Sequence, residues 1–454
     1  MNERIHLRNF RAFFEPQPIS ISRINVLVGE NSSGKSAFLA GYRVAADVDN
    51  GVYQFNFNEP PFELGSYDQI AHFRGGRGGR RRFFEVGVER PTAQFTDLQA
   101  LSGTKLGEYI RKTATFRAGL FEPYVDSLEY RCGNISITIE NYNDIENSYF
   151  IFRTLNASVR MRLSEIMPRF FSAKELSVLG VSIVFRFISD SHFAKETLGK
   201  LFDGQQSSRM ANILKEFCTI LVYYESQQYP RPIAFAPVRM KPSRTYNPLS
   251  ETKDPEGGHI PMTLARISSS SPQEWNKIRR SLEQFAKSAG LFQHIKIRRF
   301  GQKGADPFQV QIQVMGQPAN MIDVGYGVSQ ILPFIVELLR CEHGQTFLLQ
   351  QPEVHLHPRA QAELASFVAS IAIQKDLYLL IETHSDYFID RMRYETRNKK
   401  SEVNPKDVNI LFFEKGTHNG RVHNLALDEE GNIVNPPTSY REFFLEETNK
   451  ILGI

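Results

Sequence analysis

Eight residues near the start of the chain combine glycine, lysine and serine at a spacing that suits phosphate binding. Residues 29–36 have the sequence GENSSGKS, which fits the pattern G-x-x-x-x-G-K-[ST] at every fixed position. The glycines allow the backbone to curl so that its N–H groups point at phosphate oxygens, and a following helix adds the positive end of its dipole. We call residues 29–36 the phosphate loop and predict that they bind a nucleotide.

The phosphate loop contains both a cation for phosphate and a hydroxyl for a metal. Lys35 is expected to reach the outer phosphates of ATP, and Ser36 is expected to ligate Mg²⁺. The other residues expected to contact the nucleotide are Gly29, Asn31, Ser32, Ser33, Gly34 and Ala37. The alternative is an ordinary turn rich in glycine and serine, and we favour the nucleotide site because of the elements around it.

The segments on either side of the phosphate loop must form a strand and a helix for this chemistry to work. Residues 24–28 (INVLV) are typical of a buried strand, and residues 37–42 are typical of a helix start. Residues 5–10 and 19–21 indicate two strands of an antiparallel layer ahead of this unit.

The C-terminal part of the chain alternates short apolar strands with helices. Helices are predicted over residues 328–340 and 358–374, and buried strands over residues 346–349 and 377–381. Apolar strands separated by helices indicate a parallel sheet covered on both faces. We expect the strand before the phosphate loop to join this sheet, so that the middle of the chain interrupts one core.

We therefore predict an α/β fold, in which a mixed sheet has helices on both faces and an N-terminal antiparallel layer. The predicted parts are residues 1–95 (core with the phosphate loop), 96–230 (a large inserted α+β arm or lid domain) and 231–454 (the rest of the core). Within the insert, residues 96–113 and 190–224 have helical spacing.

Further elements are expected within and after the insert. Extended segments are predicted over residues 128–141 and 148–154. Beyond the insert we expect a loop over 241–260, a helix over 271–288 and extended stretches over 294–300 and 308–315.

A second motif specifies the class of nucleotide-binding protein. Residues 347–358 (FLLQQPEVHLHP) form a hydrophobic strand that ends in polar residues. With the phosphate loop, this segment resembles the ABC-type P-loop ATPases of the SMC and OLD (overcoming lysogenization defect) group. It is most similar to the stand-alone AAA-labelled ATPases of bacterial anti-phage defence modules, whose hallmark Pro-Glu-x-His-Leu-His-Pro is present at residues 352–358.

The resemblance extends to three more segments. Residues 323–330 (DVGYGVSQ) resemble the signature segment, which completes the nucleotide site of a partner subunit. Residues 382–386 resemble the segment with the switch histidine, here His384, and residues 440–444 resemble the family's C-terminal end. The resemblance implies a homodimer that encloses ATP between its subunits and that can form a higher oligomer. The residues implied to contact the nucleotide are Gly325, Gly327, Ser329 and Gln330.

Each of these motifs has a structural alternative. Gly325 and Gly327 can form a simple helix-entry turn, and His384 can be a hydrogen-bonded core residue. His355 and His357 alternate at a strand exit, but no cysteine or acidic residue has zinc spacing with them, so we favour structural hydrogen bonds over a metal site.

The sequence departs from the family at the end of this strand. Gln350 stands where the family has an acidic residue that holds Mg²⁺. Gln351 stands where a glutamate often orients water, although related defence ATPases tolerate glutamine there. An amide brings no negative charge and is not a base, so we expect slow hydrolysis. There are two alternatives: Glu353 takes over the role of the missing acidic residue, or a glutamine has been introduced to trap ATP. The predicted catalytic residues are Lys35, Gln350, Gln351, Glu353 and His384, and the predicted Mg²⁺ ligands are Ser36 and Gln350.

Composition limits the partners, metal sites and cell compartment that we expect for this protein. A net charge of +4 does not by itself demand nucleic acid, and Cys132, Cys218 and Cys341 lack metal-ligand spacing. No apolar run approaches the roughly 20 residues that span a bilayer, so we expect a cytoplasmic protein without membrane contact. The basic, glycine-rich residues 74–82 could bind DNA or RNA or could be a solvated loop, and the sequence favours neither.

These expectations lead to two hypotheses of function. The first is a dimeric ATPase that acts as sensor or regulator in a bacterial anti-phage defence system. About 70 residues follow His384, too few for the Toprim nuclease of OLD proteins, so we expect a separately encoded effector such as a nuclease or toxin. The alternative is a DNA-repair or DNA-maintenance ATPase that binds DNA directly.

Overall fold

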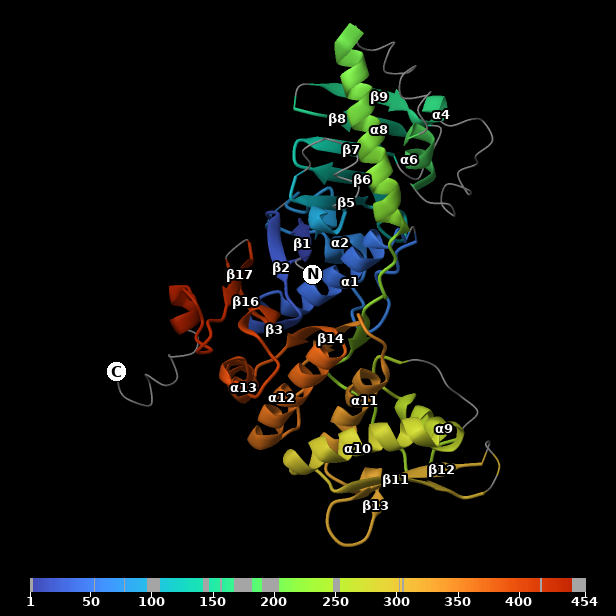
Figure 1. Cartoon of the computed structure of the whole chain (residues 1–454), viewed down its shortest axis with the longest axis vertical. Helices are drawn as coiled ribbons and strands as arrows, with labels where there is room; N and C mark the ends of the chain where they lie inside the picture. Colours follow the sequence, from blue (N-terminus) through green and yellow to red (C-terminus); the bar gives the residue numbers. More distant parts are fainter. Residues whose placement is uncertain are drawn as a thin grey trace.

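The computed structural model shows an elongated molecule with two large sheets and one small sheet (Figure 1). It describes residues 3–52, 54–76, 78–95, 107–141, 147–155, 157–166, 182–189, 204–247, 254–301, 303, 306–416 and 419–442. The helical spacing expected over 96–106 and 190–203, and residues 443–444 of the C-terminal segment 440–444, lie outside these residues.

A six-stranded sheet contains the phosphate loop strand and the C-terminal strands, as predicted. Its order is β10-β14-β15-β3-β16-β17, and neighbouring strands are parallel except for the edge strand β17. The strands are β3 (Ile24–Gly29), β10 (Ile233–Phe235), β14 (Thr346–Gln350), β15 (Tyr378–Glu382), β16 (Val408–Glu414) and β17 (Arg421–Ala426). Because β14, β15 and β3 are parallel neighbours, their carboxyl ends meet at one edge of the sheet.

Helices cover one face of this sheet and join it to a small antiparallel sheet. Apolar residues of the strands, such as Val26, Leu349 and Ile381, share one core with residues of the helices, such as Phe334 and Leu364. The helices are α9 (Ile260–Ser270), α10 (Pro272–Ser288), α11 (Tyr326–Arg340), α12 (Pro358–Gln374) and α13 (Asp386–Arg397). The small sheet is β11 (His294–Arg299), β12 (Phe308–Gln313) and β13 (Ala319–Asn320), and the predicted helices and strands of this region are confirmed.

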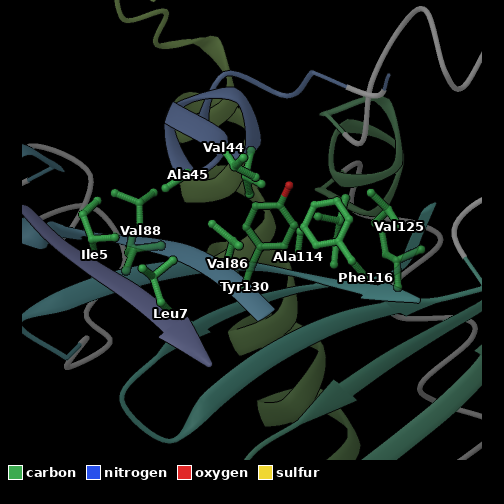
Figure 2. Close-up of a cluster of buried hydrophobic side chains, with 14 of the residues drawn as sticks. Ile5, Leu7, Val44, Ala45, Val86, Val88, Ala114, Phe116, Val125 and Tyr130 are labelled. Atoms are coloured by element: carbon green, nitrogen blue, oxygen red, sulfur yellow. The ribbon is translucent and has the colours of Figure 1, made fainter. Parts of the chain in front are cut away.

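On the opposite face, helix α1 (Lys35–Asp49) lies between the six-stranded sheet and an eight-stranded antiparallel sheet. Figure 2 shows Val44 and Ala45 of α1 above Ile5, Leu7 and Val86 of the eight-stranded sheet. This sheet has the order β2-β1-β4-β5-β6-β7-β8-β9. Its strands are β1 (Glu3–Arg8), β2 (Gln17–Ile21), β4 (Phe84–Pro91), β5 (Tyr109–Arg117), β6 (Tyr124–Cys132), β7 (Ile135–Glu140), β8 (Tyr149–Arg153) and β9 (Ser158–Arg162).

The arm continues the N-terminal antiparallel layer without a break. Strand β5 pairs with β4 along its whole length, so the sheet crosses the predicted boundary at residue 95. The helical prediction for 107–113 was wrong where β5 lies, because alternate residues such as Ile110, Ala114 and Phe116 are buried, which is the period of a strand. Helices α6 (Ser182–Ser189) and α8 (Gly204–Ser226) pack on each other along the arm (Figure 1).

Short helices complete the described chain. They are α2 (Tyr67–Ile70), η1 (Thr92–Phe95), α4 (Leu163–Ile166), η3 (Met321–Asp323) and η4 (Pro405–Asp407). Within the described ranges, no helix has both the length and the apolar character that crossing a bilayer requires.

A buried polar cluster ties the C-terminal end of α1 to the arm. Asp49 accepts hydrogen bonds from Arg90 Nε at 2.8 Å and from the hydroxyl of Tyr224 at 2.5 Å. Lys112 of β5 donates to the Asp49 backbone carbonyl at 3.2 Å and forms a 2.7 Å ion pair with Glu225 of α8. The carboxylate of Asp49 raises the pKa of Arg90 despite its burial, so the guanidinium remains charged. The phosphate-loop helix and the arm are therefore mechanically connected.

Replacing Asp49 by alanine should destabilise this junction. The substitution leaves the buried Arg90 and Tyr224 without one partner each, and breaking a buried ion pair costs about 3–5 kcal/mol. The free energy of unfolding from urea titrations measures the loss. Asp126→Ala is the matched control, because its 2.9 Å ion pair with Arg117 is more exposed and should be worth about 1 kcal/mol or less. Equal losses in the two variants would contradict a special role for the junction.

Candidate nucleotide and metal site

The phosphate loop joins the carboxyl end of β3 to the first residue of α1. Gly29 and Gly34 have φ angles of 139° and 108°, in the left-handed region that favours glycine. A Cβ at Gly29 would lie 2.4 Å from the carbonyl oxygen of Phe413 on the neighbouring strand β16. Both glycines of the motif are therefore required by backbone geometry, and no side-chain cap occupies the N-terminus of α1.

Lys35 is held over the phosphate loop. Its Nζ donates hydrogen bonds to the carbonyl oxygens of Gly29 at 2.8 Å and Glu30 at 2.7 Å. Burial lowers the pKa of Lys35, and the nearby carboxylates of Glu382 and Glu30 partly offset this effect. An anion at the loop would favour the charged ammonium, because it supplies negative charge in a site that excludes water.

A cavity of about 570 Å³ opens beside the loop, a size typical of small-molecule sites. It is lined by Ser32 and Ser33 of the phosphate loop and by the basic residues Arg11, Arg80 and Lys415. Asp68 also lines the cavity, but the basic side chains outnumber it, and walls with net positive charge suit a polyanion.

Ser36, the predicted Mg²⁺ ligand, contacts a carboxylate that the sequence did not assign. Its hydroxyl donates to the two carboxylate oxygens of Glu382 at 2.8 and 3.1 Å. Glu382 is the last residue of β15, the strand between β14 and β3. Burial raises the pKa of the Glu382 carboxyl, while the hydrogen bond from Ser36 and the charge of Lys35 act in the opposite direction.

Gln350, the other predicted metal ligand, lies beside Glu382 as its register partner across the β14–β15 pair. Both side chains are buried, and among the described residues the Gln350 Oε1 atom has no hydrogen-bond partner. Ser36 therefore meets Glu382 at this edge, with Gln350 beside it, and the Mg²⁺ roles assigned to Ser36 and Gln350 stay predictions. The next residue, Gln351, has a φ of 44°, an uncommon conformation for a residue other than glycine.

Glu353 lies at the same edge and holds the segment that carries His384. Its Oε1 atom accepts a hydrogen bond from the backbone N–H of His384 at 3.0 Å. Burial raises the pKa of the Glu353 carboxyl, and its Oε2 atom has no partner among the described residues. The sequence grouped both residues at one site, and the structure brings them together through this contact.

His384 itself is exposed, rather than enclosed in the core. Partial desolvation lowers the pKa of its imidazole, and the positive charge of Lys35 lowers it further. The ring is therefore neutral at pH 7, and it faces solvent at the edge that carries Lys35. The alternative of a buried, structural histidine does not fit this position.

Arg239 is a further buried charge that the sequence did not single out. The residue is 2% exposed, and none of its three guanidinium nitrogens has a hydrogen-bond partner among the described residues. Burial lowers the pKa of Arg239 to about 10, and the carboxylate of Glu353 acts in the opposite direction. The guanidinium lies 5.0 Å from the ring centre of Phe334, and this cation–π contact partly offsets the cost of burying it without hydrogen bonds.

The signature segment, residues 323–330, packs on the 352–358 segment. A Cβ on Gly327 would lie 2.7 Å from the carbonyl oxygen of His355, and the rings of Tyr326 and His355 meet edge to face at 5.0 Å. Gln330 is 2% exposed and bonds to the backbone of Arg239, where its Oε1 accepts from the N–H at 3.1 Å and its Nε2 donates to the carbonyl at 3.3 Å. Gly327 and Gln330 therefore have structural contacts within the chain.

Gly325 differs from the other residues of the signature segment. It is the exposed N-cap residue of α11, and a Cβ built on it would meet nothing within 4 Å. Ser329 is buried, and its hydroxyl donates to the carbonyl oxygen of Tyr326 at 2.8 Å. Gly325 is thus the predicted nucleotide contact on this segment that is open to another molecule.

The two histidines of the 352–358 segment have structural contacts. His357 is the N-cap of α12, and its Nδ1 accepts the N–H of Ala360 at 3.4 Å. The ring of His355 meets that of Tyr326 edge to face. In the part of the chain that the structure describes, no group of three or more His, Cys, Asp or Glu side chains could hold a metal ion.

The basic residues of the 74–82 loop are partly engaged with the protein. The guanidinium of Arg81 lies 4.4 Å from the ring centre of Phe14, and Arg80 donates to the carbonyl oxygen of Ala71 at 2.7 Å. Arg80 also lines the cavity beside the phosphate loop, whereas Arg82 is exposed. Placing Arg80 next to the phosphate loop required the three-dimensional structure.

Sequence reasoning missed Glu382 although a signal was present. Leu379, Leu380 and Ile381 are apolar, so a glutamate at the end of the same buried strand is unusual. Gln350 stands at the corresponding end of its own strand, and parallel register places such end residues side by side. Arg239 lies outside any motif, and we find no sequence signal that would have identified it.

Residues 243–389 match the family of the AAA ATPase domain. The matched range includes the signature segment, the 352–358 segment and His384. A comparison with curated proteins gave no match. Together with the phosphate loop, the domain match supports an ABC-type P-loop ATPase.

Solved structures of SMC head domains are similar to this chain. The Smc head bound to the C-winged helix domain of ScpA has 11% identity and a TM-score of 0.43, covering 94% of this chain and 98% of that chain. The SMC head domain from Thermotoga maritima has 9% identity and a TM-score of 0.40, covering 94% and 99%. The Smc head domain with a coiled coil and joint from Pyrococcus yayanosii has 10% identity and a TM-score of 0.42, covering 98% and 99%.

Alanine substitutions at the two signature glycines should have different effects on stability. Gly327→Ala forces a methyl group against the backbone of His355 and should lower the free energy of unfolding by about 1–3 kcal/mol. Gly325→Ala is the matched control and should change it by about 0.5 kcal/mol or less, because its Cβ enters open space. Urea titrations measure both. A neutral Gly327→Ala would contradict the close packing of α11 on the 352–358 segment.

Proposed function

We propose that this protein is an ATP-binding and ATP-hydrolysing dimer that acts as a regulator in a bacterial defence system. The observation that carries the ATPase proposal is the assembly at one sheet edge of Lys35 and Ser36 with the carboxylate of Glu382. Cation, hydroxyl and carboxylate are the groups that a P-loop site uses to hold the phosphates and Mg²⁺ of a nucleotide.

Mg²⁺ fits this edge, since Ser36 and the acidic side chain beside it offer the oxygen ligands it prefers. When bound, it would neutralise charge that develops on the transferred phosphoryl group. Lys35 would contact the outer phosphates, and the neutral imidazole of His384 can accept a hydrogen bond from the attacking water. The amide of Gln351 can orient that water but cannot remove its proton, which favours slow turnover.

A second subunit would complete the site. Gly325 is exposed and unobstructed at the N-terminus of α11, as a residue that meets a partner's nucleotide must be. Tyr326, the next residue, is 42% exposed. Val238 and Met240 flank Arg239, whose backbone bonds to Gln330 of the same helix, and they are 71% and 48% exposed. Exposed apolar groups beside a polar site favour contact with another protein surface.

Contacts within the chain connect the signature segment with residues 382–386, which carry His384 and which we call the switch segment. Gln330 bonds to the backbone of Arg239, the charge of Arg239 acts on Glu353, and Glu353 accepts the N–H of His384. We propose that closing two subunits around ATP acts on this series of contacts, and that α1 passes the change to the arm through Asp49. Hydrolysis would then release the closed state.

The defence role depends on the resemblance of residues 352–358 and the associated segments to the ATPases of anti-phage modules. On this proposal the effector, a nuclease or toxin, is a separate polypeptide, and the arm is the part whose position changes with the nucleotide. The alternative is a DNA-repair or DNA-maintenance ATPase. The exposed Arg82 in the 74–82 loop favours it, because exposed arginines bind the phosphate backbone.

Mixed subunits test whether the nucleotide site is composite. Lys35→Ala should remove phosphate binding, and Gly325→Glu should place a negative charge against a partner's nucleotide, so each variant alone should lack ATPase activity. A mixture contains heterodimers with one intact composite site. With random mixing and independent sites, it should recover about a quarter of wild-type activity.

The control for this experiment is Glu429→Gln, an exposed substitution distant in sequence from every motif. Mixing it with Lys35→Ala measures dilution of active subunits alone. Failure of the Lys35→Ala and Gly325→Glu mixture to recover activity would contradict the shared site, as would full activity of Gly325→Glu by itself.

Purification from the native operon tests the separate effector. We expect a nuclease or toxin polypeptide to co-purify with the wild-type chain, and its retention to differ between ATP and nucleotide-free buffer. Asp49→Ala should weaken that difference, because it loosens the connection between α1 and the arm. Repeated recovery of the chain alone, or DNA in place of a protein, would favour the alternative function.

A further inference from the structure

We infer that Glu382 supplies the carboxylate that holds Mg²⁺ at the nucleotide site, a role transferred from the end of β14 to the end of the adjacent strand β15. This inference rests on the proposed ATPase function and adds to it the identity of the metal-holding acid. It also offers a physical account of how a chain with Gln350 and Gln351 can retain a functional metal site.

The contact between Ser36 and Glu382 is the first support. The Ser36 hydroxyl lies 2.8 and 3.1 Å from the two carboxylate oxygens of Glu382. Oxygen atoms that share an octahedral Mg²⁺ shell, with metal–oxygen distances of about 2.1 Å, lie about 3.0 Å apart. The separation therefore suits a serine hydroxyl and a carboxylate that face the same cation, directly or through its water.

Strand register explains how an acid on β15 can take the role of an acid at the end of β14. Gln350 and Glu382 are partners across the parallel β14–β15 pair, and Glu382 pairs with Leu27 of β3 on its other side. Register partners on parallel strands point to the same face of a sheet. That face is the one covered by α1, since Leu348, Leu380 and Phe38 share one core. Glu382 is also one strand closer than Gln350 to the strand that carries the phosphate loop.

Unpaired polar atoms beside this contact indicate that it is incomplete without a ligand. Gln350 is 7% exposed and Glu353 is 5% exposed. Gln350 Oε1 and Glu353 Oε2 have no hydrogen-bond partner among the described residues. Buried acceptors of this kind are costly unless a donor or cation satisfies them, and the water shell of a bound Mg²⁺ supplies such donors.

Glu353 is a less suitable candidate for the same role. Its Oε1 atom is already engaged with the backbone N–H of His384, and its carboxyl interacts with the charges of both Arg239 and Glu382. The Glu382 carboxylate meets the hydroxyl of the phosphate loop itself. Glu353 is therefore assigned to positioning the switch segment, and Glu382 to the metal.

Exchanging the acid between the two strands tests the inference. Isothermal titration of a non-hydrolysable ATP analogue, with Mg²⁺ and with EDTA, gives the gain in affinity that depends on the metal. Glu382→Gln should reduce that gain by about 10–100-fold, the usual cost of losing a group that supports a bound metal, while affinity in EDTA is retained. The double variant Gln350→Glu/Glu382→Gln should restore most of the gain.

Glu429→Gln is the matched control, since it removes an exposed carboxylate and should leave the Mg²⁺-dependent gain at the wild-type value. Glu382→Ala gives a second measurement if Glu382→Gln fails to fold. An unchanged gain in either Glu382 variant would overturn the inference. An equal loss in Glu382→Gln and in the double variant would also overturn it, because the effect would then follow the substitution and not the charge.

Failure of the proposed function would give a different result. A wild-type chain that binds the analogue neither with Mg²⁺ nor with EDTA would contradict the nucleotide site itself. A wild-type chain that binds the analogue with a Mg²⁺-dependent gain, unaltered by Glu382→Gln, would leave the nucleotide site intact and reject only the assignment of Glu382.

Discussion

The parallel register of β14, β15 and β3 is the constraint on which the candidate site depends. Each strand is mostly apolar, and Gln350 and Glu382 are the last residues of β14 and β15. Because the three strands run in the same direction, Gln350, Glu382 and the phosphate loop meet at one edge. A buried sheet admits charged groups where water or a ligand can solvate them, so burial of the strands and clustering of the site have one cause.

Helix α1 connects this edge of the sheet with the arm. Its first residue is Lys35, and its last, Asp49, lies in the buried polar cluster with Arg90 and Tyr224. The helix packs between two sheets, and packed interiors transmit displacement instead of absorbing it. Since the eight-stranded sheet continues directly into the arm, a change at the phosphate loop has a short structural route to the arm (Figure 1).

The position of Glu382 changes what Gln350 and Gln351 imply for metal binding. Taken from the motif alone, they remove the negative charge that a metal site needs. In the structure a carboxylate lies on the neighbouring strand and touches Ser36. The metal-holding and water-handling roles then separate: the first has a candidate acid, whereas Gln351 still offers no base. On the proposed function, this separation would favour tight nucleotide binding combined with slow hydrolysis.

Local sequence determined the phosphate loop, its flanking strand and helix, and the alternating C-terminal elements, because glycine spacing and apolar periodicity are properties of neighbouring residues. It misassigned the first part of β5, because residues 109–113 were included in a predicted helix although they begin a strand with alternate buried residues. Three features were decided by the tertiary structure alone. The arm extends the N-terminal sheet, the Gln330 side chain hydrogen-bonds to the backbone of Arg239, and the Ser36 hydroxyl contacts Glu382. These contacts join residues 91 to 346 positions apart, or depend on which strand pairs with which, and no local pattern encodes that choice.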